Sequence, residues 1–244
     1  MIEILCNDIY NLFLSGNKAN NRELFDKVFE ISRYFFQNPF TLESLENLFE
    51  LEKKLMNSKG PHKQFIEENI FQSLSRGTLY CASEQHDNEY LTLNAELIER
   101  ATDDKEKQRY IMALKLVSFA SEIFKFKKAR DNFNNKRKSL ALGILGNICN
   151  YYNVPEALEL CLLSLKSKKK TLILAALEFQ ENYCRNREVP LRSEIIEILD
   201  RIIIHTKDHS AAVGALDLLV KTGNISEFEA LSRIDEWKEK NDYW

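Results

Sequence analysis

Apolar residues recur at helical spacing along most of the chain, and this pattern predicts a protein built from helices. In segment 20–37 the apolar positions, from Leu24 to Phe35, fall on one face of a helix. Segment 78–88 has no such period and is expected to be a loop. The pattern therefore predicts an all-α protein. The other segments with helical spacing before residue 130 are 41–55, 62–75, 90–100 and 103–126.

Short polar signals mark where several of these helices begin. Asn20, Asp103 and Ser226 each stand three positions before a glutamate, which is the spacing of a capping box. Thr41 is expected to cap the helix of segment 41–55. The last helix, after Ser226, is expected to present a polar outer face, as the end of a helical stack does.

Three consecutive segments of the C-terminal half repeat one another: 137–169, 170–204 and 209–237. Aligned positions are spaced by 32 and then 39 residues, which is the period of a repeated helix pair. Because neither helix of a pair hides its apolar stripe alone, the pairs are expected to stack on one another. The aligned positions are Ser139, Thr171 and Ser210, and Leu145, Leu177 and Leu216.

Each repeat has a first helix rich in small residues and a second helix rich in leucine or isoleucine. Gly143, Gly146 and Ala176 are among the small residues, which allow close approach of a neighbouring helix. Pro155 and Pro190 follow a polar break and are expected to occupy the first turn of each second helix, where a missing N–H costs nothing. This arrangement resembles the HEAT repeat and its armadillo relatives.

The resemblance implies a fold and a broad role. It implies a right-handed α-solenoid of about five or six HEAT-like helix pairs, forming one domain over residues 1–244. Helix pairs in 1–135 are less regular, and residues 136–244 hold the clearest repeats and a C-terminal cap. Proteins of this kind characteristically bind macromolecules on extended surfaces.

Composition is that of an ordered protein with few turn formers. The chain has 244 residues, of which 44% are hydrophobic and 29% charged, with only 7 Gly and 4 Pro. Its apolar opening carries Glu3 and Asp8 and no basic residue, so we expect it to be neither a signal peptide nor a membrane span. The five cysteines form no CxxC pair, and we expect reduced thiols and a cytoplasmic location.

Charge is unevenly distributed along the chain. Residues 1–124 carry a net charge of −6, residues 125–192 carry +8 and residues 193–244 carry −5. Loops between successive helix pairs lie on one edge of a solenoid, so the basic residues of the middle segment are expected to form one ridge. Its candidate contacts are Lys127, Lys128, Arg130, Lys136, Arg137, Lys138, Lys168, Lys169 and Lys170.

Such a ridge has two interpretations. Clustered Lys and Arg can bind phosphates, a nucleic-acid backbone or an acidic protein. Alternatively, basic residues near helix ends simply satisfy exposed carbonyl groups and keep loops soluble. We expect a non-catalytic scaffold that binds a macromolecular partner, in the first place a protein, through a concave solenoid face and this basic edge.

The alternative function is nucleic-acid binding, including a relative of the DNA glycosylases that are built from HEAT-like repeats. In that family an aromatic-lined groove with a carboxylate lies amid strong positive charge. Here Trp237 and Trp244 fall in the acidic C-terminal part, and the isoelectric point is about 5.9. A third possibility, that the chain is a subunit of a larger assembly, predicts a large exposed apolar face.

Other candidate chemistry is weak. His205 and His209 have the spacing of two metal ligands, with Asp208 beside them, but they are expected to straddle a loop. Cys81 with His86 could be a nucleophile and its base.

Two pairs of adjacent carboxylates, Glu67-Glu68 and Asp103-Asp104, are expected to be solvated or capping groups. No glycine-rich phosphate loop or kinase signature occurs. The sequence therefore indicates no catalytic residue, no cofactor and no metal.

Overall fold

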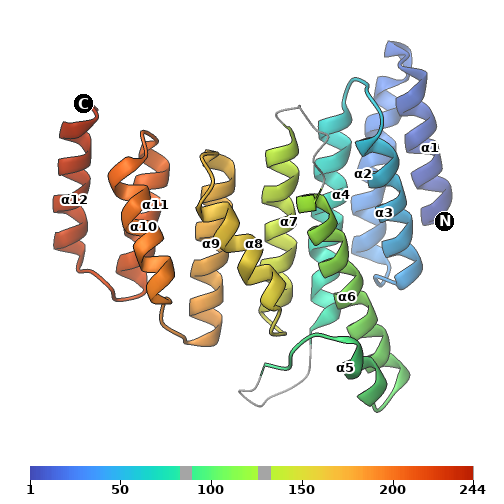
Figure 1. The fold of residues 1–244 in the computed structure, drawn as a ribbon. Helices are drawn as coiled ribbons and strands as arrows, with labels where there is room; N and C mark the ends of the chain where they lie inside the picture. Colours follow the sequence, from blue (N-terminus) through green and yellow to red (C-terminus); the bar gives the residue numbers. More distant parts are fainter. Residues whose placement is uncertain (83–89, 126–132, 244) are drawn as a thin grey trace. The chain divides into compact units, whose positions relative to one another are not determined.

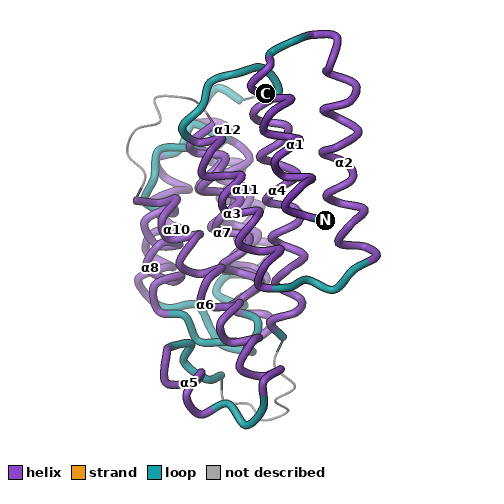
Figure 2. Tube along the Cα trace, turned by 90° about the vertical axis from the view of Figure 1, so that its right-hand side faces the viewer, coloured by secondary structure: helices purple, strands orange, loops and turns teal. Residues whose placement is uncertain are grey.

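The structure, a computed structural model, describes residues 1–82, 90–125 and 133–243, and all the named elements in these residues are helices (Figures 1 and 2). Twelve α-helices and two short 3-10 helices are formed by the described residues, without a β-strand. The predicted all-α class is therefore confirmed. The helices are α1 Ile2–Ser15, α2 Asn21–Gln37, α3 Leu42–Met56, α4 Lys63–Gly77, α5 Ala95–Arg100, α6 Asp104–Lys125, α7 Phe133–Cys149, α8 Pro155–Leu165, α9 Lys170–Arg187, α10 Ser193–His205, α11 His209–Lys221 and α12 Glu227–Lys240.

Internal contacts divide the chain into two compact units, which are described separately here. Unit 1 comprises Met1–Glu122 together with Tyr151–Asn153. Unit 2 comprises Ile123–Asn150 and Val154–Trp244. The expectation of one continuous domain over 1–244 stays a prediction.

In unit 1, helices two places apart in the chain pack side by side. Helix α1 contacts α2 and α3, and α4 contacts α2 and α3, so the four helices form two layers. The apolar faces predicted from the sequence fill the space between them, with Ile9, Val28 and Leu48 fully buried. Helix α6 joins this group through Phe119, whose ring stacks on Phe49 of α3 at a centroid distance of 4.2 Å.

The predicted helix over 90–100 is wrong in its first half, because residues 91–93 are extended. The amide of Leu93 donates to the carbonyl of Asn153 (3.0 Å), and the amide of Asn153 donates to the carbonyl of Leu91 (2.9 Å). Helix α5 begins only at Ala95, after Asn94, whose side chain accepts from the amide of Leu97. Extended pairing and an N-cap thus replace the first turns of the expected helix.

In unit 2 the first helices of successive repeats pack on one another. Helix α9 lies between α7 and α11, while α8 contacts α7 and α9, and α10 contacts α11 and α8. The small residues of the first helices are enclosed where these helices meet, as the sequence predicted: Ala141, Ala176 and Ala212 are fully buried. An added Cβ at Gly146 would lie 3.3 Å from the ring of Phe179, so this position requires a small residue.

Two of the predicted helix caps are confirmed. The Thr41 hydroxyl accepts from the amide of Ser44, and the Ser44 hydroxyl accepts from the amide of Thr41, which completes a capping box. Ser226 caps α12 by accepting from the amide of Glu229.

The capping box expected at Asn20 is not formed. Asn20 ends a short 3-10 helix, Lys18–Asn20, which is capped instead by Asn17. At the start of α6, Asp103 does accept from the amide of Glu106, but the Glu106 carboxylate accepts from Thr102.

The two prolines differ in their positions. Pro155 is the first residue of α8, as predicted. Pro190 precedes α10 by three residues, because the chain stays irregular until Arg192 and the helix begins at Ser193. Similar Val-Pro pairs therefore mark the start of a helix in one repeat and a loop in the next.

None of the helices in the described residues is long and apolar enough to cross a membrane.

A matched pair of glycine substitutions tests the packing of α4. An added Cβ at Gly77 would lie 2.7 Å from the ring of buried Phe40, whereas one at Gly143 would meet nothing within 4 Å. We expect Gly77→Ala to lower the free energy of unfolding by about 1–3 kcal/mol because the ring must move. Gly143→Ala should raise it by up to about 1 kcal/mol through helix propensity. Urea denaturation measures both, and equal effects would contradict the packing.

Candidate functional site: a basic edge of unit 2

The two clusters of basic residues predicted from the sequence precede helices that start at the same end of unit 2. Helices α7 and α9 pack side by side, and α8 returns the chain between them, so the N-termini of α7 and α9 lie at one end (Figure 1). The first cluster occupies the start of α7, and the second occupies the connection between α8 and α9. We call the described lysines here the basic edge: Lys136, Lys138, Lys166, Lys168, Lys169 and Lys170.

The first cluster lies only partly within the described residues, and one of its members there is buried. Lys127, Lys128 and Arg130 lie outside the described residues. Arg137 is only 1% exposed, so burial removes it from the set of surface contacts. Helical periodicity explains this, since one of several consecutive basic residues at the start of α7 must face inward.

The other two lysines of the first cluster, Lys136 and Lys138, are half-buried. The Lys138 ammonium group lies 5.7 Å from the centroid of the Phe124 ring, within the range of a cation–π contact.

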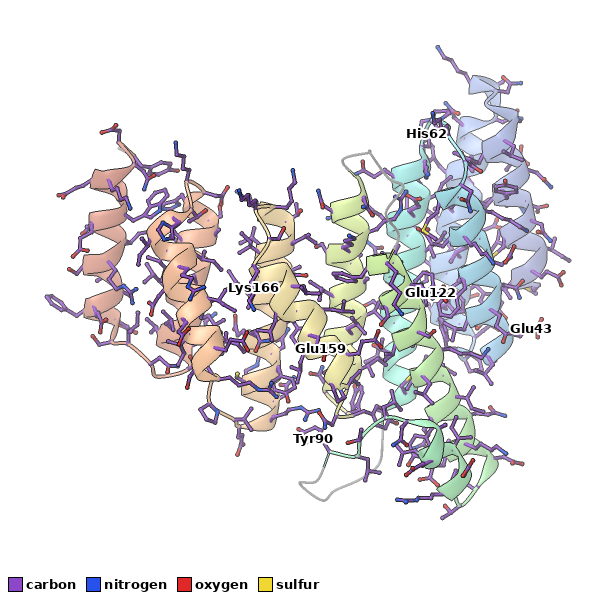
Figure 3. The ribbon with its side chains drawn as sticks, in the orientation of Figure 1. Glu43, His62, Tyr90, Glu122, Glu159 and Lys166 are labelled. Carbon is purple, nitrogen blue, oxygen red and sulfur yellow. The ribbon has the colours of Figure 1, made fainter. Side chains whose placement is uncertain are left out.

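In the second cluster, two lysines are paired with carboxylates of the following repeat. The Nζ atom of Lys166, labelled at the end of α8 in Figure 3, lies 2.9 Å from a carboxylate oxygen of Glu194. Lys170 Nζ lies 3.1 Å from Asp208 and donates to the hydroxyl of Ser210 at 3.1 Å. Sequence reasoning missed these carboxylates, although each lies roughly one repeat length further along the chain.

Lys168 and Lys169 are the exposed lysines of the basic edge that have no carboxylate partner among the described residues and can therefore bind a ligand. Both side chains are exposed, and no carboxylate among the described residues lies within ion-pair distance of either. Helix α9 begins directly after Lys169, with no side-chain cap and no acidic residue in its first turn. The positive end of a helix thus coincides with two free ammonium groups, an arrangement that attracts carboxylates or phosphates.

Asp208 links this edge to α11. It is the N-cap of α11 and accepts from the amide of Ala211 at 2.9 Å. Partial burial is the largest single influence and opposes ionisation, but the Ala211 amide and Lys170 together outweigh it, so the pKa of Asp208 lies below its ordinary value. The carboxylate is therefore ionised at neutral pH and neutralises Lys170.

The second helices of unit 2 carry the opposite charge. Glu156 and Glu159 of α8 and Glu197 of α10 are exposed. The basic edge is consequently a local feature next to acidic helices, rather than one part of a broadly positive surface.

The cysteines do not provide a nucleophile. All five side chains are buried. Burial raises the pKa of the Cys81 thiol to about 12, and the thiol donates to the carbonyl of Gly77 at 3.7 Å. Its suggested partner, His86, lies outside the described residues. A thiol with this pKa is protonated at neutral pH and unreactive.

The two histidines occupy different helices and have different surroundings. His205 ends α10, and His209 begins α11. The His209 ring stacks on Tyr243 at a centroid distance of 4.7 Å and lies 5.5 Å from the ring of Trp237. No group of three metal-ligating side chains occurs in the part of the chain that the structure describes.

The expectation that Glu67 is solvated is wrong. Glu67 is fully buried between α4 and its neighbours, together with Glu52 of α3, and its carboxylate lies 3.9 Å from Lys63 Nζ. Glu68, by contrast, is partly exposed and accepts from the side-chain amide of Gln64. Helical periodicity separates the two adjacent residues, as expected, but it turns one of them into the core.

The Asp208–Lys170 pair predicts a pH-dependent stability. Because the folded pKa of Asp208 is depressed, its contribution is full above the ordinary value of about 3.9 and is lost as pH falls through the folded pKa. Asp208→Asn keeps a capping side chain, so we expect a loss of at most about 1 kcal/mol at pH 7 that disappears in acid. Asp208→Ala should lose about 1 kcal/mol more at every pH. Urea denaturation at several pH values measures this, and a pH-independent Asn effect would contradict it.

A thiol-labelling experiment tests the burial of the cysteines. In the native protein at pH 8 we expect no rapid reaction with a disulfide reagent such as DTNB, because all five thiols are enclosed. After denaturation all five should react. Rapid labelling of Cys81 in the folded protein would show that its surroundings are open.

Comparison with known proteins adds no relative, since no family model, curated protein or solved structure matches this chain. The geometry described above is therefore the basis for proposing a function.

Proposed function

We propose that this protein is a non-catalytic scaffold, an α-solenoid of HEAT-like helix pairs, that binds an acidic segment of a protein partner at the basic edge of unit 2. The observation that carries the proposal is the pair of exposed lysines, Lys168 and Lys169, at the uncapped start of α9. Two ammonium groups and a helix N-terminus together favour carboxylates placed beside them.

The solenoid part of the proposal is supported by the order of helix contacts within each unit. In unit 2 the succession α7, α9, α11 is packed as one layer, and the helices between them pack on its flank. In unit 1, α1 packs on α3 and α2 packs on α4. Contacts between each helix and the helix two places along are what stacked helix pairs require.

Charge at the edge favours a protein partner over a nucleic acid. Two lysines of the second cluster are already neutralised by Glu194 and Asp208, and exposed glutamates follow on α8 and α10. A nucleic-acid site must neutralise several consecutive phosphates, and nearby carboxylates would repel the backbone. A short acidic peptide segment needs only a few positive charges.

The surroundings of Trp237, the one tryptophan among the described residues, do not support a base-excision enzyme. Trp237 is buried, and its indole N–H donates to the carbonyl of Thr206 at 2.9 Å, so it does not line an open groove. Trp244 lies outside the described residues.

The proposal predicts a specific loss of binding on charge reversal. Fluorescence anisotropy with labelled polyglutamate, duplex DNA and single-stranded RNA would be measured at about 50 mM and about 200 mM salt. We expect polyglutamate to bind, and the double variant Lys168→Glu/Lys169→Glu to weaken it by about tenfold at the lower salt concentration.

The matched control reverses two exposed lysines of α6, Lys105 and Lys107, which changes the net charge equally. Binding should be unaffected by that control. Equal losses in both variants would show that only net charge matters and would contradict a site at the edge. Tighter, steeply salt-dependent binding of duplex DNA would support the nucleic-acid function instead.

A further inference from the structure

Helix α2 of unit 1 exposes two phenylalanines on its solvent side. Phe29 is 48% exposed and Phe36 is 74% exposed. Seven residues separate them, so they lie on one side of the helix about 10 Å apart along its axis. The ring of Phe29 meets the edge of Phe65 from α4 at a centroid distance of 5.6 Å. Apolar surface therefore extends from α2 to α4.

Two arginines accompany these rings. The Arg76 guanidinium lies over the Phe36 ring, 4.1 Å from its centroid, and Arg33 is exposed between the two phenylalanines in the sequence. Among the described residues, no carboxylate pairs with either arginine, and the Nη1 atom of Arg76 is buried without a hydrogen-bond acceptor. We call this surface the α2–α4 face: Phe29, Arg33, Phe36, Phe65 and Arg76.

Such a surface suits a particular kind of partner. Exposed aromatic rings and arginine are the side chains most enriched at the centres of protein interfaces. An arginine stacked on a ring keeps donors that match a carboxylate in geometry. The α2–α4 face therefore fits a helix that presents apolar side chains together with carboxylates.

Helix α12 of unit 2 presents such a combination. Phe228 is 83% exposed and Leu231 is 62% exposed, although the sequence pattern predicted a polar outer face. Asp235 and Glu239 are exposed as well, and their spacing from Leu231 and Phe228 places all four on the same side of the helix. Asp235 also forms an exposed ion pair with Lys238 of the same helix at 3.0 Å, which a docked arginine would share or replace.

The opposite side of α12 is firmly held within unit 2. The Trp237 indole donates to the carbonyl of Thr206, and Arg233 forms an ion pair with Asp200. These contacts fix which side of α12 faces solvent. The exposed apolar and acidic side is thus a stable feature of the unit rather than the result of a loosely attached helix.

We propose that α12 of one copy of this protein docks on the α2–α4 face of a second copy. Phe228 and Leu231 pack against Phe29 and Phe36, and the carboxylates of Asp235 and Glu239 pair with Arg33 and Arg76. The occupant is a second copy because the chain itself carries an acidic, apolar helix that complements an arginine-bearing, apolar face.

Two different surfaces meet in this contact, so the association is heterologous. The α2–α4 face and α12 can therefore be altered independently of each other. One variant can carry a disrupted α2–α4 face and a second variant a disrupted α12. A mixture of the two then retains only one productive contact, between the intact α12 of the first variant and the intact α2–α4 face of the second.

Sedimentation velocity of the full chain, from about 5 µM to about 200 µM, tests the self-association at concentrations around a micromolar dissociation constant. We expect the wild-type chain to form larger species as concentration rises. Leu231→Glu and Phe36→Glu should each abolish association throughout this range, because the new carboxylate would be buried against apolar surface.

The chain offers a closely matched control. Leu163 of α8 is 63% exposed, compared with 62% for Leu231. Leu163→Glu makes the same change at an equally exposed position and should leave association intact. Circular dichroism and urea denaturation of each variant show whether the fold is retained. Equal loss of association in Leu163→Glu would overturn the assignment to α12.

Mixing experiments identify the two surfaces as partners. Phe36→Glu and Leu231→Glu, each monomeric alone, should form one-to-one dimers and nothing larger when mixed. Charge exchange gives a second test: Arg33→Glu/Arg76→Glu and Asp235→Arg/Glu239→Arg should each be monomeric alone and associate when mixed.

Three results would overturn the proposal. A wild-type chain that stays monomeric at every concentration excludes self-association. Association that survives both single-face variants places the contact elsewhere. Failure of the mixed variants to associate, while both remain folded, shows that the two surfaces do not bind each other.

Discussion

The helices that pack at the centre of each unit carry an apolar stripe wider than one neighbouring helix can cover, and this constraint organises both units. In unit 1, α1 is covered by α2 and by α3, and in unit 2, α9 is covered by α7, α8 and α11. These helices need a partner two places along the chain as well as the adjacent one. Small residues such as Ala176 make that second contact possible, because they let two helices approach closely.

The sequence anticipated those features that depend on local patterns. Helical periodicity predicted the all-α class, and the caps at Thr41 and Ser226 followed from side chains that satisfy backbone amides a few residues away. Errors arose where a distant part of the chain intervenes. Residues 91–93 are extended because Asn153, some 60 positions further on, pairs with them. Nothing in the local pattern near Tyr90 carries that information.

At the candidate site, too, local patterns were predicted from the sequence and contacts with distant parts of the chain were not. A run of basic residues was visible in the sequence, but which of them are available depends on helix rotation and on partners a repeat away. Rotation of α7 buries Arg137, and Asp208 and Glu194 neutralise two of the lysines that follow α8. The exposed aromatic rings of α2 and α12 were not predicted either. Helical periodicity shows which residues of a helix face the core, but it does not show that an aromatic residue outside that face is exposed on the surface.

The hydrogen bond from the Tyr152 hydroxyl to the carbonyl of Cys81, 2.6 Å long, has a consequence for the synthesis of the protein. It joins residues 71 positions apart and is buried, whereas the named links within unit 2 join residues at most 40 apart. Helices α1 to α4 can pair as soon as they leave the ribosome, since their contacts are local. Unit 1 nevertheless stays incomplete until α7 has been made and Tyr152 has emerged. Unit 1 is therefore finished by a segment translated after the first helix of unit 2, so the synthesis of unit 2 has begun before unit 1 can close.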